Sequence, residues 1–167
     1  MQKGKAFALR PTIAVHNRQR AFRVDLTELQ TFSEKVLENC LSLPGKQSSE
    51  IRKLSELNVM VVSDRRMAEL HRRFLQVRGP TDVLTFVHGE IFVSAGTAKK
   101  NARRFRTSLD HELRLYIAHG LLHLHGFDDQ DAAGAAEMSR LQERLVRSST
   151  GTLPVGREGD SPAKRRR

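Results

Sequence analysis

Cysteine and long hydrophobic runs are nearly absent from this sequence. The 167 residues include one cysteine, Cys40, so an internal disulfide is excluded and a reducing cytoplasm is the expected compartment. The spacing of the apolar residues around Cys40 predicts that it lies on the apolar face of a helix and packs in the protein core. No run approaches 18 apolar residues, so we expect no membrane-spanning segment.

Acidic residues are also scarce. Lys and Arg number 29 against 19 Asp and Glu, which gives a formal net charge of +10. The first 24 residues contain no acid, and residues 164–167 form a second basic segment. The basic residues of the first segment are Lys3, Lys5, Arg10, Arg18, Arg20 and Arg23. This excess favours a polyanionic partner such as nucleic acid, and a basic surface that serves only solubility is the alternative.

Two histidines four residues apart form the clearest chemical motif, HGLLHLHGFDD, which begins at His119. On an α-helix, His119 and His123 lie about one turn apart on the same face, so both imidazoles can bind one metal ion. Gly126 is predicted to end this helix, and the chain reversal after it can bring Asp128 or Asp129 to the pair. Two nitrogens and one oxygen around zinc leave a fourth position for water, which is typical of a catalytic site.

The neighbours of this pair refine the prediction. Apart from Arg114, segment 113–118 is apolar, and leucines recur at 121, 122 and 124, so the helix is expected to be largely buried. His125 lies roughly opposite His123 on the helix, which favours a solvent-facing or capping role over metal ligation. Gly120 stands where the HExxH zincins carry their general-base glutamate, so we do not expect a metalloprotease of that type.

The motif resembles the HGxLHLxGYDH signature of the YbeY family, the bacterial metalloendoribonucleases of rRNA maturation. The matched residues are His119, Gly120, Leu122, His123, Leu124, Gly126 and Asp128. Phe127 replaces the usual tyrosine, and Asp129 stands where the family usually has its third zinc histidine. Residues 80–86 resemble the family's PTDVLSF strand, residues 89–91 its GDI segment and residues 135–138 its AEEM-like run. The resemblance covers roughly residues 11–147.

The resemblance implies both a function and a ligand set. It implies a zinc-dependent endoribonuclease that cleaves single-stranded RNA in 16S rRNA maturation and ribosome quality control. The implied partners are rRNA and the small ribosomal subunit in the cytoplasm, with no DNA and no membrane. One Zn²⁺ ion per chain would be held by His119, His123 and Asp129.

One departure from the family pattern concerns RNA binding. The family commonly has an arginine five residues before the proline of PTDVLSF, and this position is Leu75 here. Arg72, Arg73 and Arg78 are the candidates to bind nucleic acid in its place.

No residue is assigned as general acid or base, and attack by water or by the RNA's own 2′-hydroxyl both stay open. A non-catalytic rRNA-binding assembly factor and a metal hydrolase of another substrate are the alternative functions.

The element pattern predicts an α+β fold, a small mixed β-sheet packed with helices. Residues 1–147 are expected to form one domain, and residues 148–167 a disordered basic tail. Asp25 and Asp64 are expected to cap two helices, and Ser108 or Asp110 to cap the helix that carries the HxxxH motif. The other expected elements are helices at 99–106 and 131–146 and strands at 13–19, 57–62, 83–86 and 90–94.

Overall fold

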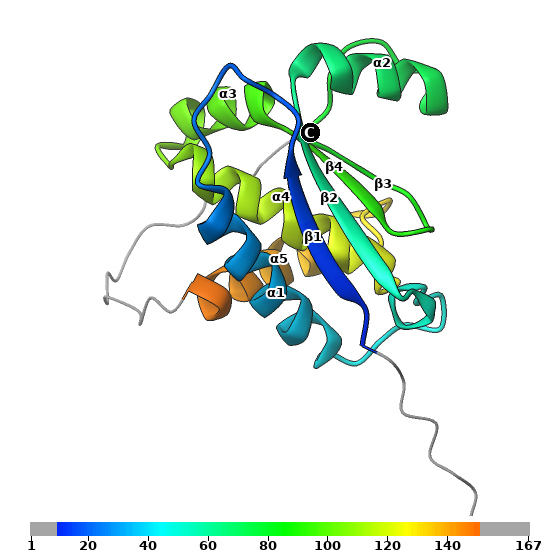
Figure 1. Ribbon diagram of the computed structural model, residues 1–167. Coiled ribbons are helices and arrows are strands. Elements are labelled where there is room, and N and C mark those ends of the chain that lie inside the picture. The colour runs from blue at the N-terminus through cyan, green and yellow to red at the C-terminus, as the bar shows by residue number, and fades with distance from the viewer. Residues whose placement is uncertain (1–9, 151–167) are drawn as a thin grey trace, which may run out of the picture.

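A computed structural model describes residues 10–150, which form a four-stranded sheet and five α-helices (Figure 1). The strands are β1 (Thr12–Asn17), β2 (Glu56–Val62), β3 (Val83–Thr85) and β4 (Glu90–Ser94). The helices are α1 (Leu26–Leu41), α2 (Asp64–Leu75), α3 (Ala95–Phe105), α4 (Leu109–Leu124) and α5 (Ala132–Thr150). The predicted α+β class with a mixed sheet is therefore confirmed. Lys3, Lys5 and the basic segment 164–167 lie outside the described residues.

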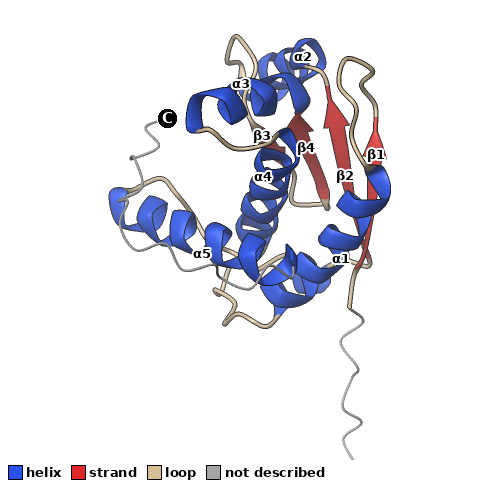
Figure 2. Cartoon of the chain, turned by 90° about the vertical axis from the view of Figure 1, so that its left-hand side faces the viewer, coloured by secondary structure: helices blue, strands red, loops and turns tan. Residues whose placement is uncertain are grey.

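The sheet has the strand order β1-β2-β4-β3, with β1, β2 and β4 parallel and β3 antiparallel at one edge. Side chains alternate between its two faces, which we call the inner and the outer face. The inner face packs against α1 and α4, with α5 beyond them (Figure 2). The outer face is covered mainly by α2, through a smaller cluster that contains Met67, Leu70 and Leu84. Parallel neighbours require crossover connections, which α1 and α2 supply.

Helix α4 is the central helix and is buried on most of its surface. Its N-cap is Ser108, whose side chain accepts a hydrogen bond from the His111 amide at 3.0 Å. Gly120 faces the sheet so closely that an added Cβ would lie 2.7 Å from Ile91 Cγ2 and 3.0 Å from Thr85 Oγ1. A glutamate at this position has no room, which gives a physical reason for the missing HExxH glutamate.

The end of α4 is a Schellman motif. The Phe127 amide donates to the Leu122 carbonyl at 3.0 Å, and the Gly126 amide donates to the His123 carbonyl at 3.0 Å. Gly126 has φ +94°, the left-handed conformation that this motif requires and that glycine adopts without strain. The predicted helix stop at Gly126 is confirmed, and the chain turns back directly after the two histidines.

His125 differs from its predicted solvent-facing role because it is fully buried as the C-cap residue of α4. Its Nε2 lies 3.0 Å from the Leu43 carbonyl, and its Nδ1 lies 3.1 Å from Ser49 Oγ. The Glu50 amide also donates to the Leu124 carbonyl at 2.8 Å. The loop after α1 therefore covers the end of α4, and the capping alternative for His125 fits the structure.

The two predicted caps before α1 and α2 have different outcomes. Asp25 caps α1 as expected, since its Oδ1 accepts from the Glu28 amide at 3.0 Å. Asp64 does not cap α2; the N-cap is Ser63, whose Oγ accepts from the Arg66 amide at 3.2 Å. The Asp64 side chain turns instead toward α3, whose first residues satisfy it.

Helices α3 and α5 are both longer than predicted. α3 begins at Ala95 rather than at residue 99, and α5 continues to Thr150. The predicted domain boundary after residue 147 thus lies within α5, where Ser149 is buried and its Oγ accepts from Asn39 Nδ2 at 3.0 Å. Among residues 10–150, no helix has the length and apolarity needed to cross a membrane.

Candidate metal centre

His119 and His123 lie in the last two turns of α4 and face each other. Their Nε2 atoms are 2.9 Å apart, and their ring centroids are separated by 4.6 Å with nearly perpendicular planes. The His119 side chain is 5% exposed, whereas that of His123 is 30% exposed. The predicted placement of both imidazoles on one helix face is therefore correct, and the pair opens to solvent on the side of His123.

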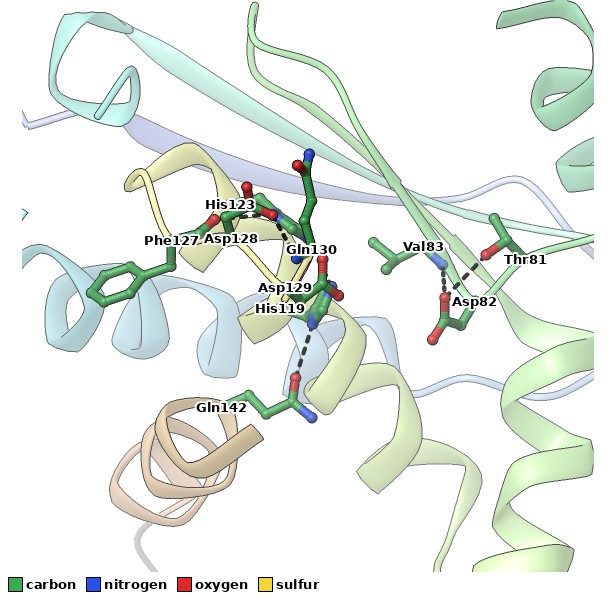
Figure 3. A network of polar contacts seen from close by, with 10 residues as sticks. All are labelled: Thr81, Asp82, Val83, His119, His123, Phe127, Asp128, Asp129, Gln130 and Gln142. Carbon is green, nitrogen blue, oxygen red and sulfur yellow. Dashed lines mark hydrogen bonds and ion pairs between the residues drawn. The ribbon is translucent and has the colours of Figure 1, made fainter. Parts of the chain in front are cut away.

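Asp129 is brought to this pair by the reversal at Gly126 (Figure 3). Its Oδ2 lies 3.7 Å from His119 Nε2, and its Oδ1 lies 3.7 Å from His123 Nε2. The three residues form the only group of this kind among residues 10–150, with one donor atom from each within 4.8 Å of the others. The structure thus brings together the three residues that the sequence predicts as ligands.

In both histidines, Nδ1 has a hydrogen-bond partner outside the pair, and this partner fixes which ring nitrogen carries the proton. His123 Nδ1 lies 3.1 Å from the Phe127 carbonyl oxygen, which can only accept, so Nδ1 donates. His119 Nδ1 lies 3.0 Å from Gln142 Oε1 and donates to it in the same way. Both Nε2 atoms then present lone pairs toward each other and toward the carboxylate.

A divalent cation fits this donor set. Two lone pairs 2.9 Å apart beside a carboxylate repel one another unless a positive charge lies among them. Ligands about 2.0–2.2 Å from one zinc ion lie at most about 4 Å apart, and the separations of 2.9 and 3.7 Å meet this limit. Two imidazoles and a carboxylate are donors that zinc accepts, and a backbone carbonyl such as that of Phe127 is a usual partner of a metal-bound histidine.

Two other residues of the motif are engaged elsewhere. Asp128 is exposed, and its Oδ1 accepts from the Gln130 amide at 3.0 Å, which folds the loop that carries Asp129. His125 uses both ring nitrogens to hold the loop after α1. The geometry therefore favours Asp129 over both as the third donor.

Gln142 contacts this centre, and its role is not among those predicted from the sequence. It comes from α5, is buried, and reaches His119 across the contact between α4 and α5. The signal was present: Gln142 lies four residues after Met138 and three before Leu145, on the buried stripe of α5. A polar side chain in an apolar stripe requires a buried partner, and His119 is that partner.

The three arginines predicted to bind nucleic acid are exposed, but they do not form one group. Arg72 and Arg78 line a cavity of about 500 Å³ between α2 and the segment that follows it. Arg73 points elsewhere, with its guanidinium carbon 5.5 Å from the Phe74 ring centroid. Leu75, at the position of the family's arginine, is 57% exposed.

Comparison with known proteins identifies the family. The profile described as endoribonuclease YbeY matches residues 14–150. The endoribonuclease YbeY of Synechococcus sp. (strain CC9902) is 37% identical over 146 residues, which cover 77% of this chain and 79% of that protein. The endoribonuclease YbeY of Thermotoga maritima is 36% identical over 117 residues, which cover 65% of this chain and 78% of that protein.

A solved structure agrees with these relatives. The solution structure of a Thermotoga maritima protein superposes with a TM-score of 0.60 at 30% identity, and the match covers 84% of this chain and 90% of that one. The chain therefore belongs to the endoribonuclease YbeY family.

Proposed function

We propose that this protein is a metal-dependent endoribonuclease that cleaves single-stranded RNA, with His119, His123 and Asp129 as the ligands of one Zn²⁺ ion. The observation that carries the proposal is the convergence of two Nε2 lone pairs and a carboxylate at the end of α4. The names of the relatives supply the class of reaction, since each of those compared in sequence is an endoribonuclease YbeY.

The protein prepares this site in several ways. When bound, zinc would act as a Lewis acid toward a phosphate oxygen and lower the pKa of a bound water. Gln142 and the Phe127 carbonyl hold the Nδ1 protons, so the Nε2 atoms of both histidines point to one place. The buried His119 closes the inner side of the site, whereas His123 and Asp129 are 30% and 24% exposed and leave the other side open to a polymer.

The proposed substrate is 16S rRNA, and the proposed roles are its maturation and ribosome quality control on the small ribosomal subunit. The net charge of +10 supports a polyanionic substrate. Arg72 and Arg78, which share one exposed cavity, support phosphate contacts beside the sheet. The proposed location is the cytoplasm, the compartment that contains ribosomal RNA.

The test combines metal analysis with a cleavage assay. Protein purified without chelator should contain about one zinc per chain and should cut a 5′-labelled single-stranded RNA, and chelation should abolish cleavage until zinc is restored. His123→Ala should lose both the metal and the cleavage while its circular dichroism spectrum keeps the native helix content. A matched control is His111→Ala, a change at the other end of α4 that should alter neither.

The contrary results are equally specific. Protein that binds no stoichiometric transition metal excludes the proposed centre. Zinc-loaded protein that binds the RNA without cutting it, and whose binding survives His123→Ala, is instead the non-catalytic assembly factor that the sequence left as an alternative.

A further inference from the structure

A row of aromatic rings leads from the outer face of the sheet to the surface. Phe92 on β4 packs against Phe86, which follows β3, with ring centroids 5.8 Å apart. Phe86 in turn lies 5.0 Å from Phe74 at the end of α2 and 5.7 Å from His88. We call Phe74, Phe86, His88 and Phe92 the outer aromatic cluster. Two separate elements, α2 and the β3–β4 turn, supply its exposed rings.

The surface end of this cluster is unusually apolar. Phe74 is 52% exposed and the next residue, Leu75, is 57% exposed, while Val87, which follows Phe86 in the chain, is 71% exposed. Burial against the core does not explain these residues, because the buried cluster that contains Met67, Leu70 and Leu84 does not include them. The Phe74–Phe86 contact joins the two segments that carry these residues, and exposed apolar side chains gathered in this way are typical of a binding surface.

The cations around the cluster indicate which partner fits. The Arg73 guanidinium lies 5.5 Å from the Phe74 ring centroid, so a cation and an aromatic face are presented together. Arg72 and Arg78 line a separate cavity beside α2, and within residues 10–150 neither they nor Arg73 forms an ion pair. Aromatic faces bordered by unpaired cations bind single-stranded nucleic acid, in which bases stack on the rings and phosphates meet the cations.

The outer aromatic cluster and the metal centre lie on opposite faces of the sheet, and β3 passes between them. In β3, Thr85 points to the inner face, where its Oγ1 approaches Gly120 of α4, between His119 and His123. The next residue, Phe86, points to the outer face. Because β3 is the edge strand, a polymer held at the metal centre can pass over this edge to reach Phe86 and Phe74.

We propose that unpaired RNA bases flanking the cleaved bond stack on the outer aromatic cluster. This inference rests on the proposed function for the identity of the polymer, but it concerns binding rather than cleavage. The inference assigns Phe74 as a substrate-binding residue. It makes Leu75 part of the exposed apolar surface beside Phe74 rather than a phosphate-binding residue.

The first test uses the absence of tryptophan from this chain. Phe74→Trp introduces a single indole into the cluster, and a base that stacks on it quenches its emission. A 12-nucleotide oligouridine should therefore quench the emission in the presence of chelator, and an abasic ribose-phosphate chain of the same length should not. Leu26→Trp, which places the indole at a 40% exposed site on α1, is the control and should show no quenching with either chain.

The second test measures affinity by fluorescence anisotropy with the same oligouridine, again in chelator. Phe74→Leu keeps an apolar side chain but removes the ring, and it should weaken binding about five- to tenfold, the lower part of the range for one stacked base. Leu26→Ala should leave the affinity unchanged. Unquenched emission together with unchanged affinity of Phe74→Leu overturns the proposal and leaves a protein as the partner of this surface.

The two proposals fail separately. RNA that quenches the Phe74→Trp emission but is not cut by the zinc-loaded protein supports the stacking surface and contradicts the nuclease. RNA that is cut, with no effect of Phe74→Leu on affinity, supports the nuclease and contradicts the stacking surface.

Discussion

The three histidines at the end of α4 are distinguished by what their ring nitrogens contact. His119 and His123 each give Nδ1 to an oxygen acceptor and keep Nε2 directed at the other histidine. His125 instead uses both nitrogens, one on the Leu43 carbonyl and one on Ser49 Oγ. A metal can therefore compete for the first two histidines without breaking the fold, whereas His125 is part of the fold itself.

Substitution of Asp129 and His125 should separate metal binding from stability. Asp129→Ala removes a donor 3.7 Å from both Nε2 atoms and should greatly weaken zinc binding, whereas Asp129→His should keep or strengthen it. His125→Ala should retain zinc but lower the free energy of unfolding by about 1–3 kcal/mol, since a buried carbonyl loses its partner. Metal titration and urea unfolding measure the two effects, and the reverse order of zinc loss would assign His125 as the ligand.

Gln142 is a positioning residue for His119, and its replacement should change metal affinity. Gln142→Leu removes the acceptor for Nδ1, so the zinc dissociation constant should rise about 10–100-fold. Gln142→Glu keeps an acceptor and should restore most of the affinity. A competition titration with a zinc chelator measures both, and equal affinities for the wild type and Gln142→Leu would show that the contact does not orient His119.

For single residues, the sequence predicts correctly those positions that depend on spacing within one helix and its turn. The four-residue spacing of His119 and His123 and the glycine turn before Asp129 are local, and the structure places all three residues as expected. The roles of His125 and Gln142 depend on partners 82 and 23 residues away in the chain. Such contacts form only through tertiary packing, which helix periodicity does not reveal.

Among the elements, α4 is fixed by its close approach to the sheet. Gly120→Ala should stabilise an isolated helix by about 1 kcal/mol, yet here the added methyl would lie 2.7 Å from Ile91 Cγ2. Because overpacking costs about 1–3 kcal/mol, we expect a net loss of about 0–2 kcal/mol, together with weaker zinc binding as α4 shifts. Ala136→Gly, at an exposed site on α5, gives the propensity effect alone. A Gly120→Ala variant that is more stable than the wild type in urea would contradict this packing.

A second element contact, between α2 and α3, predicts a pH dependence. Asp64 accepts from the Thr97 amide at 2.7 Å, from Lys100 Nζ at 2.9 Å and from the Ser94 hydroxyl. Partial burial raises the pKa of Asp64, but the hydrogen bonds from Lys100, Ser94 and Thr97 outweigh it and hold the pKa below its ordinary value of 3.8. The folded state therefore binds the proton less tightly than the unfolded state.

The sign of the stability effect follows from this lowered pKa. The contribution of Asp64 is fully present above about pH 4–5 and is lost as the pH falls through 3.8 and then through the lower pKa of the folded state. Asp64→Asn should be less stable than the wild type at pH 7, and the difference should shrink in acid. Thermal unfolding between pH 7 and pH 3 measures it, and a difference that grows in acid would exclude the contact as its source.

The elements also show where sequence patterns end. Helix and strand positions follow from apolar periodicity and were predicted to within a few residues, apart from the start of α3 and the end of α5. Ser63 and Asp64 are both good N-cap residues, and the choice between them depends on Thr97, which is 33 residues away. The strand order β1-β2-β4-β3 likewise depends on pairings between distant segments.

The whole molecule places two proposed contacts with RNA on opposite faces of one sheet. The metal centre lies on the inner side, at the end of α4, and the outer aromatic cluster lies on the outer side, at β4 and the β3–β4 turn. The net charge of +10 acts on a polyanion at longer range than either contact. Affinity for RNA should therefore contain a salt-dependent part from phosphates and a salt-independent part from stacked bases.

Salt titration separates these two parts. The logarithm of the association constant for single-stranded RNA should fall linearly with the logarithm of the salt concentration, by about 0.7 for each phosphate neutralised. Arg72→Gln and Arg78→Gln each remove one exposed cation from the same cavity, so each should reduce the slope by about 0.7. Phe74→Leu should lower the affinity at every salt concentration and leave the slope unchanged, because a ring releases no counterions. An affinity that does not depend on salt would exclude a basic RNA-binding face, and a slope that falls in Phe74→Leu would mean that the ring acts by placing Arg73 on a phosphate rather than by stacking.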